Sequence, residues 1–136
     1  MPTEARGMDS ADSTPQEPTL KALAQEGLAR ARSGRFFDAH ESWEDAWRAC
    51  SGSEKLYLQA LIQAAAALHH GAAGNERGRL SLLEKARVKM ASLATSSFPL
   101  PPWAQEAGLP EASAFLPALH ACLESPAADP VLFNPR

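Results

Sequence analysis

The segment of residues 36–48 combines an imidazole and a carboxylate with several aromatic side chains, in a spacing that indicates chemistry. At 100° per residue on a helix, His40 lies on the same side as Trp43 and Trp47. Glu44 follows His40 by about one turn on that side. Because a polar group that is buried without a partner costs several kcal/mol, we expect His40 and Glu44 to meet a side chain, a metal or a ligand.

These side chains suit a divalent metal. His40 and Glu44, at i and i+4, point the same way, and His70 from a later segment would complete a set of two histidines and one carboxylate. By ligand type this set suits Mn, Fe or Zn, and it leaves positions open for water. Glu41 stands where H-E-x-x-H metallohydrolases hold their general base, although Glu44 replaces their second histidine. A metal-dependent hydrolase with Glu41 as the base is one hypothesis.

A second segment, residues 57–78, supplies further polar side chains from an otherwise almost wholly apolar helix, which should lie at the centre of a bundle. Its narrow polar stripe carries Gln59, Gln63 and His70 and faces either solvent or the first segment. In the second case a pocket between the two helices would bind a small polar ligand. The residues expected to line this pocket are His40, Trp43, Glu44, Gln63 and His70.

Another interpretation needs no ligand. In a structural or self-association module, four of these polar residues would only hydrogen-bond one another across two packed helices and define their register. An Ala-rich central helix can also pack closely against a second copy of the chain, so a homo-oligomer remains open. The four residues of that network would be His40, Glu44, Gln63 and His70.

The two segments resemble, in order and spacing, a bacterial and archaeal family catalogued as domain of unknown function 309. The resemblance covers residues 34–90 and implies a small helical domain without naming an activity. The positions that carry it are Phe37, His40, Glu41, Glu44, Trp47, Leu61, Ile62, Gln63, His70, Gly74, Asn75 and Gly78.

Composition excludes several classes of partner. With 136 residues and a formal charge of −3, the chain has no global field that would attract nucleic acid or an anionic membrane. The longest apolar stretch, residues 60–68, is interrupted by Gln63 and is too short to span a bilayer, so we expect a soluble protein with no membrane partner. Cys50 and Cys122 show neither metal nor redox spacing, and no secretory segment is visible. These features predict a cytoplasmic location.

Basic residues gather on the helix expected over residues 76–94. Glu76 and Glu84 interrupt them, and no aromatic residues interleave for base stacking. A solvated basic face is therefore expected, and nucleic acid is not an expected partner. The basic residues are Arg77, Arg79, Lys85, Arg87 and Lys89.

The elements that must position these side chains are helices. Apolar periodicity and end signals predict four main helices, over about residues 18–34, 35–49, 53–70 and 76–94. Asn75 should cap the fourth helix, and Gly78 in its first turn indicates tight packing. On the 35–49 helix, Asp38, Ser42 and Asp45 lie opposite the aromatic side and should meet water.

The predicted fold class is all-α. We expect a compact bundle of about four main helices, a proline-rich C-terminal strap over residues 98–103 and a short last helix over residues 111–123, which Pro117 would kink or confine to a first turn. Residues 1–17 lack large apolar side chains and should form a disordered tail. Residues 18–124 should form a single helical domain with its family-like core at 34–90, and residues 125–136 a loop.

Overall fold

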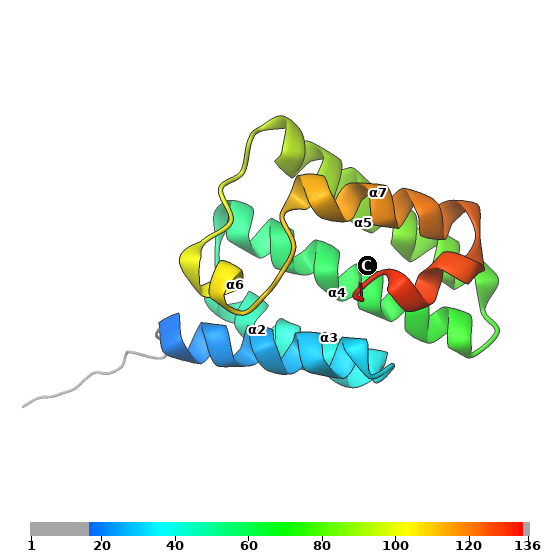
Figure 1. The fold of residues 1–136 in the computed structure, drawn as a ribbon, viewed down its shortest axis with the longest axis horizontal. Helices are drawn as coiled ribbons and strands as arrows, with labels where there is room; N and C mark the ends of the chain where they lie inside the picture. The colour runs from blue at the N-terminus through cyan, green and yellow to red at the C-terminus, as the bar shows by residue number, and fades with distance from the viewer. Residues whose placement is uncertain (1–16, 135–136) are drawn as a thin grey trace, which may run out of the picture.

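The computed structural model describes residues 17–134, which form helices joined by short connections (Figure 1). The predicted all-α fold is confirmed, because no strand occurs within residues 17–134. The expected N-terminal tail, apart from Glu17, lies outside the described residues. In chain order the helices are α2 (Glu17–Arg32), α3 (Phe36–Ala49), α4 (Gly52–Ala72), α5 (Glu76–Thr95), α6 (Pro102–Glu106), α7 (Ala112–Glu124) and the 3₁₀ helix η1 (Pro126–Val131).

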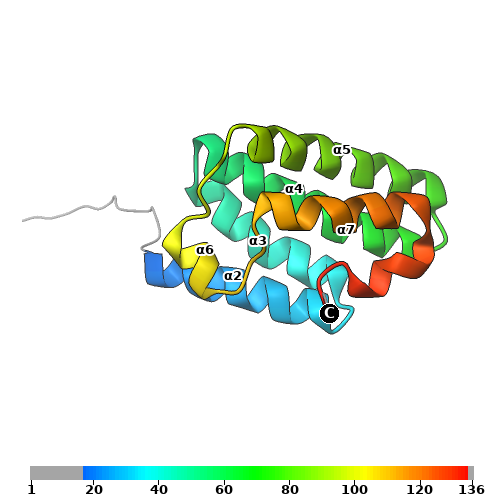
Figure 2. The ribbon, with the colours of Figure 1, turned by 45° about the horizontal axis from the view of Figure 1, so that its top comes forward.

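The helices α2 to α5 pack against one another in chain order, and α7 then lies along α5 (Figures 1 and 2). As predicted, α4 is central, since it packs against both α3 and α5 and buries most of its apolar residues. After α7, η1 leads the chain back beside the turn between α2 and α3 (Figure 2). None of the helices in this part of the chain combines the length and the apolar character needed to cross a membrane.

Local signals at the ends of α4 and α5 act as the sequence predicts. Gly74, after the last turn of α4, has a φ of +83°, a left-handed conformation that favours glycine. Asn75 caps α5, because its side chain accepts a hydrogen bond of 3.0 Å from the backbone N–H of Gly78. The turn between these two helices is thus determined within a few residues of the chain.

The C-terminal third agrees with the prediction in its last helix and differs from it in the proline-rich segment and in the C-terminal loop. Within the proline-rich segment, Pro102 and Trp103 begin the short helix α6, because a proline at the first helical position needs no N–H partner. The predicted last helix is confirmed as α7, which runs from Ala112 to Glu124, and Pro117 does not confine it to a first turn. Part of the predicted C-terminal loop is the 3₁₀ helix η1, where Ser125 Oγ accepts from the N–H of Ala127 at 3.2 Å.

Close contact between α2 and α3 organises the core on that side. Trp43 is fully buried, and its Nε1 donates to the backbone oxygen of Ala24 at 3.3 Å. The indole lies against Gly27, where a Cβ atom would be 2.3 Å from Trp43 Nε1. Phe133, beyond η1, contacts both Trp43 and Phe115 of α7, with ring centroids 5.5 and 5.6 Å apart. The C-terminal segment therefore completes the core between α3 and α7.

Candidate functional site

The outer face formed by α3 and α4 carries the predicted polar residues. Two contacts establish how the helices are aligned. Phe37 packs on His69 with ring centroids 5.6 Å apart, and Lys55 Nζ lies 4.0 Å from the centroid of the Trp47 ring. The helices therefore run in opposite directions, and Gln63 lies near the level of His40 on α3. Gln63 and His40 therefore lie at a similar level along the two helices.

His40 and Glu44 form a pair on this face. His40 Nε2 lies 3.6 Å from Glu44 Oε2, an ion-pair contact when the imidazole is protonated. The imidazole also stacks on Phe37, with ring centroids 5.7 Å apart and an interplanar angle of 26°. Glu44 accepts a second contact from Arg48 Nη2, at 3.2 Å. The carboxylate thus orients the imidazole by its Nε2 edge and leaves Nδ1 for another partner.

Three buried polar atoms on α3 and α4 have no hydrogen-bond partner among the described residues. They are His40 Nδ1, Trp47 Nε1 and Gln63 Oε1, and we call them the unpartnered atoms. Trp47 Nε1 only donates and Gln63 Oε1 only accepts, while His40 Nδ1 accepts when the ring proton is on Nε2, toward Glu44. Leaving such an atom unpaired costs about 1–3 kcal/mol. A hydrogen-bonding group that reaches any of these buried atoms would therefore be stabilised there.

His70 is held in a different environment, at the turn between α4 and α5. Its Nδ1 lies 3.0 Å from Asn75 Nδ2, and because Asn75 Oδ1 already accepts from Gly78, the amide must donate to the imidazole. A Cβ atom at Gly78 would lie 2.7 Å from Asn75 Nδ2 and 3.2 Å from His70 Cγ. His70, Asn75 and Gly78 therefore form one tightly packed unit that stabilises the start of α5.

The predicted ligand and network sets are not assembled. Within residues 17–134 no group of three or more His, Cys, Asp or Glu side chains could hold a metal ion. His40 contacts Glu44, whereas His70 contacts Asn75, so neither the metal set nor the four-residue hydrogen-bond network is formed. Binding of Mn, Fe or Zn by these residues, and hydrolysis with Glu41 as the base, gain no support from the geometry.

Glu41 opens instead onto a polar groove between α2 and α3. Glu41 is exposed, and the groove has a volume of about 350 Å³ and no aromatic wall. Three of the groove's four carboxylates already have an arginine partner on their own helix, since Glu26 pairs with Arg30, and Glu44 and Asp45 both pair with Arg48. The residues that line this groove are Glu26, Arg30, Glu41, Ser42, Glu44, Asp45 and Arg48.

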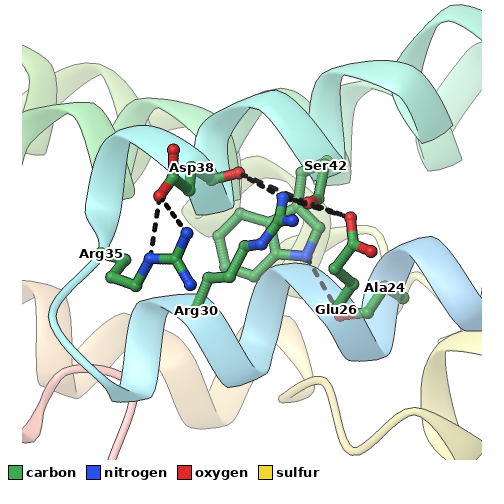
Figure 3. A network of polar contacts seen from close by, with 7 residues as sticks. Ala24, Glu26, Arg30, Arg35, Asp38 and Ser42 are labelled. Atoms are coloured by element: carbon green, nitrogen blue, oxygen red, sulfur yellow. Dashed lines mark hydrogen bonds and ion pairs between the residues drawn. The ribbon is translucent and has the colours of Figure 1, made fainter.

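Two residues of α3 face the opposite way from the prediction. Trp43 was expected to line the α3–α4 pocket, but it packs against α2. Ser42 was expected to meet water, yet it is only 2% exposed. The Ser42 hydroxyl donates to Glu26 Oε2 and accepts from Arg30 Nη1, both at 2.7 Å (Figure 3). Because α3 packs between α2 and α4, it has two buried sides, and a single amphipathic stripe does not describe it.

Arg79 was predicted on a solvated basic face, but it is 1% exposed. Its Nε and Nη2 donate to the two carboxylate oxygens of Asp129, each at 2.8 Å, and its Nη1 donates to Glu76 at 2.9 Å. Nη2 also donates to the backbone oxygen of Cys122. Gly71 makes room for this side chain, because a Cβ atom there would lie 2.7 Å from Arg79 Cδ. Helical periodicity places residues 79 and 83 on one apolar side of α5, and this pattern could have predicted the burial of Arg79.

Comparison with known proteins shows that part of the chain is similar to one family. A family model described as Domain of unknown function (DUF309) matches residues 24–82, from within α2 to the first part of α5. No curated protein matches the chain. The matched region contains the unpartnered atoms, the His70–Asn75–Gly78 unit and Arg79. The resemblance predicted from the motif residues is confirmed, because over residues 24–82 the chain matches the model of the DUF309 family.

Proposed function

We propose that this protein is a binding module whose α3–α4 face holds a short peptide with free ends. The observation that carries the proposal is the presence of the three unpartnered atoms, at His40, Trp47 and Gln63. A role in binding rather than catalysis is supported by the position of Glu41, which opens onto the α2–α3 groove. The ligand is then polar, as the sequence predicts, and its chemical class is a short peptide.

The two ends of the face favour opposite kinds of ligand group, a hydrogen-bond donor at one end and an acceptor at the other. Near His40 and Gln63 the unpartnered atoms accept hydrogen bonds, and the Glu44 carboxylate adds negative charge, so this end suits an ammonium or N–H group. Near Trp47 the unpartnered atom donates, and the Lys55 ammonium lies 4.0 Å above the indole, so this end suits a carbonyl or carboxylate. A peptide with free termini carries these two groups in the matching order.

The spacing sets the length of the ligand. His40 and Trp47 are seven residues apart on one helix, which corresponds to about 10 Å along its axis at 1.5 Å per residue. An extended chain of about three residues covers that span. The proposed ligand is therefore a tripeptide, with its amino end at His40 and Gln63 and its carboxyl end at Trp47 and Lys55.

Titration of ¹⁵N-labelled protein with trialanine tests this proposal, because the indole N–H of Trp47 has its own signal. We expect saturable shifts of that signal and of the Gln63 side-chain amide. Gln63→Leu should weaken binding at least about tenfold, whereas Gln59→Leu, a half-buried glutamine one turn away, should leave it unchanged. Indole and amide signals that do not move at millimolar trialanine would overturn the proposal.

Blocked peptides test the direction of binding. Amidating the carboxyl end of trialanine should weaken its binding to the wild type and have little further effect on Lys55→Gln, because both changes remove the same charge pair. Acetylating the amino end should weaken binding to the wild type but have little further effect on Glu44→Gln. If amidation weakens binding equally in wild type and Lys55→Gln, the assigned direction is wrong.

Self-association is a second candidate function for the same face. Phe37 at its edge is 52% exposed, and an exposed aromatic side chain suits a protein partner such as a second copy of the chain. Sedimentation velocity over a range of protein concentrations, without peptide, distinguishes the two functions. A dimer that Phe37→Ser dissociates would favour self-association, and a monomer throughout would favour the peptide.

The cytoplasmic location predicted from the sequence also remains a proposal. It is supported by Cys50 and Cys122, which are both buried and both free thiols. Free thiols persist in reducing compartments. Expression of the full chain with a fluorescent tag, followed by fractionation, would test the location directly.

A further inference from the structure

A second hollow lies at the end of the bundle, where α2 turns into α3. Its volume is about 510 Å³, within the range of about 300–1,000 Å³ that is typical of small-molecule sites. Three parts of the chain meet there: the α2–α3 turn, the C-terminal end of α4, and η1 with the residue that follows Phe133. The walls are mostly apolar, and they are formed by Ala31, Phe36, Leu68, Pro126 and Pro130. This hollow shares no residue with the unpartnered atoms.

Two charged residues line the hollow, and only one of them is compensated. Both carboxylate oxygens of Asp129 are held at 2.8 Å by the buried guanidinium of Arg79. Arg32 is exposed and forms no ion pair with any acidic side chain of residues 17–134. Its Nε donates to the backbone oxygen of Phe133 at 2.9 Å, which holds the guanidinium at the rim. The rim therefore presents one positive charge, and the two terminal nitrogens of that guanidinium are not needed for the bond to Phe133.

We propose that this hollow binds a small amphipathic carboxylate, with the carboxylate on Arg32 and the apolar part against the walls. The terminal nitrogens of a guanidinium match the two oxygens of a carboxylate, and a guanidinium already held by its Nε is oriented for that contact. A single cation suits a monoanion, and the neighbouring Asp129 carboxylate disfavours a ligand of higher negative charge. The apolar walls favour a hydrocarbon chain over a second polar group.

Three eight-carbon probes that differ only in their head group test the proposal on the full chain by calorimetric titration. Octanoate should bind saturably, octanol about tenfold more weakly, and octylammonium more weakly still. Arg32→Gln should lower the affinity for octanoate to the affinity for octanol. Arg35→Gln is the matched control, because Arg35 is an exposed arginine on the same turn whose guanidinium contacts Asp38.

Ala72→Phe tests the apolar part of the site, because Ala72 is an exposed residue that lines the hollow and a larger side chain would fill it. This variant should bind octanoate and octanol more weakly by a similar factor. Its thermal unfolding temperature should stay close to that of the wild type. Equal affinities for the three probes, or an unchanged octanoate affinity in Arg32→Gln, would overturn the proposal. Neither outcome bears on the peptide proposal, whose residues lie on a different face.

Discussion

Arg79 and Asp129, 50 residues apart in the sequence, form a two-pronged ion pair in which both N···O distances are 2.8 Å. The Arg79 guanidinium also reaches Glu76 and the backbone of Cys122, so one buried side chain connects α5, the end of α7 and η1. Each of its three nitrogens has a partner, which is the condition under which a buried charge is tolerated. This arrangement positions the C-terminal segment against the bundle.

Arg79→Met should lower the free energy of unfolding by about 3–5 kcal/mol, because it leaves the Asp129 carboxylate without its partner in a largely buried place. Arg77→Met, at an exposed arginine of the same helix, should change it by less than about 0.5 kcal/mol. Denaturation by urea measures both values. Comparable losses in the two variants would contradict a structural role for the ion pair.

Gly27→Ala should destabilise the protein even though alanine favours helices. The added Cβ atom would lie 2.3 Å from Trp43 Nε1, and overpacking of this kind costs about 1–3 kcal/mol. Gln25→Ala, an exposed site on α2, should be close to neutral. The cost of Gly27→Ala should shrink in a Trp43→Phe background, where the ring is smaller, and a cost that stays the same there would contradict the assigned clash.

Asn75→Ala should lower the free energy of unfolding by about 0.5–2 kcal/mol, because the N–H of Gly78 loses its acceptor at the start of α5. Asn75→Asp should cost less, since it keeps that acceptor and loses only the donor to His70. Thermal unfolding of the two variants checks the order. If Asn75→Asp lowered the free energy of unfolding as much as Asn75→Ala, the contact with His70 would contribute more to stability than the cap.

The two thiols should make stability fall at alkaline pH. Burial, followed by the nearby Glu54, raises the pKa of Cys50 from 9.0 to about 11, and burial, followed by Asp129, raises the pKa of Cys122 to about 12. Above pH 9 the unfolded chain therefore releases thiol protons that the folded chain keeps. The free energy of unfolding falls with rising pH from about 9 to 11, and the contribution is fully present below pH 9.

Urea denaturation at several pH values between 7 and 11 measures this dependence. Cys50→Ala should reduce the slope above pH 9, because it removes one titrating group. Burial also raises the pKa of the Tyr57 hydroxyl, so Tyr57→Phe should reduce the remaining slope above about pH 10. A stability that stays flat or rises from pH 9 to 11 in the wild type would contradict the pKa shifts.

Much of the fold could be predicted from local patterns. The bounds expected for the main helices agree with α2 to α5 to within about two residues, because periodicity and end signals act over a few residues. The Asn75 cap was recognisable for the same reason. The helix α6 was missed because consecutive prolines indicate extended chain, although one proline at a helix start is allowed.

Less of the site could be predicted. The sequence predicted one pocket lined by His40, Glu44 and Gln63; the structure pairs His40 with Glu44 and leaves Gln63 Oε1 without a partner among residues 17–134. The sequence could not show that His70 lies apart from this set, because His70 contacts Asn75 at the turn between α4 and α5. It also could not identify Trp47 as an unpartnered donor, because an indole on an apolar side is expected to find a partner in the core.

By itself, the sequence determined the helices, their order and the resemblance of residues 24–82 to the DUF309 family, since these depend on neighbours along the chain. Only the tertiary structure decided that Ser42 and Trp43 face α2, that Arg79 is buried against Asp129, and that the unpartnered atoms lie between α3 and α4. The physical reason is that burial and pairing of a side chain depend on which distant helix packs over it, and helical periodicity contains no information about that helix.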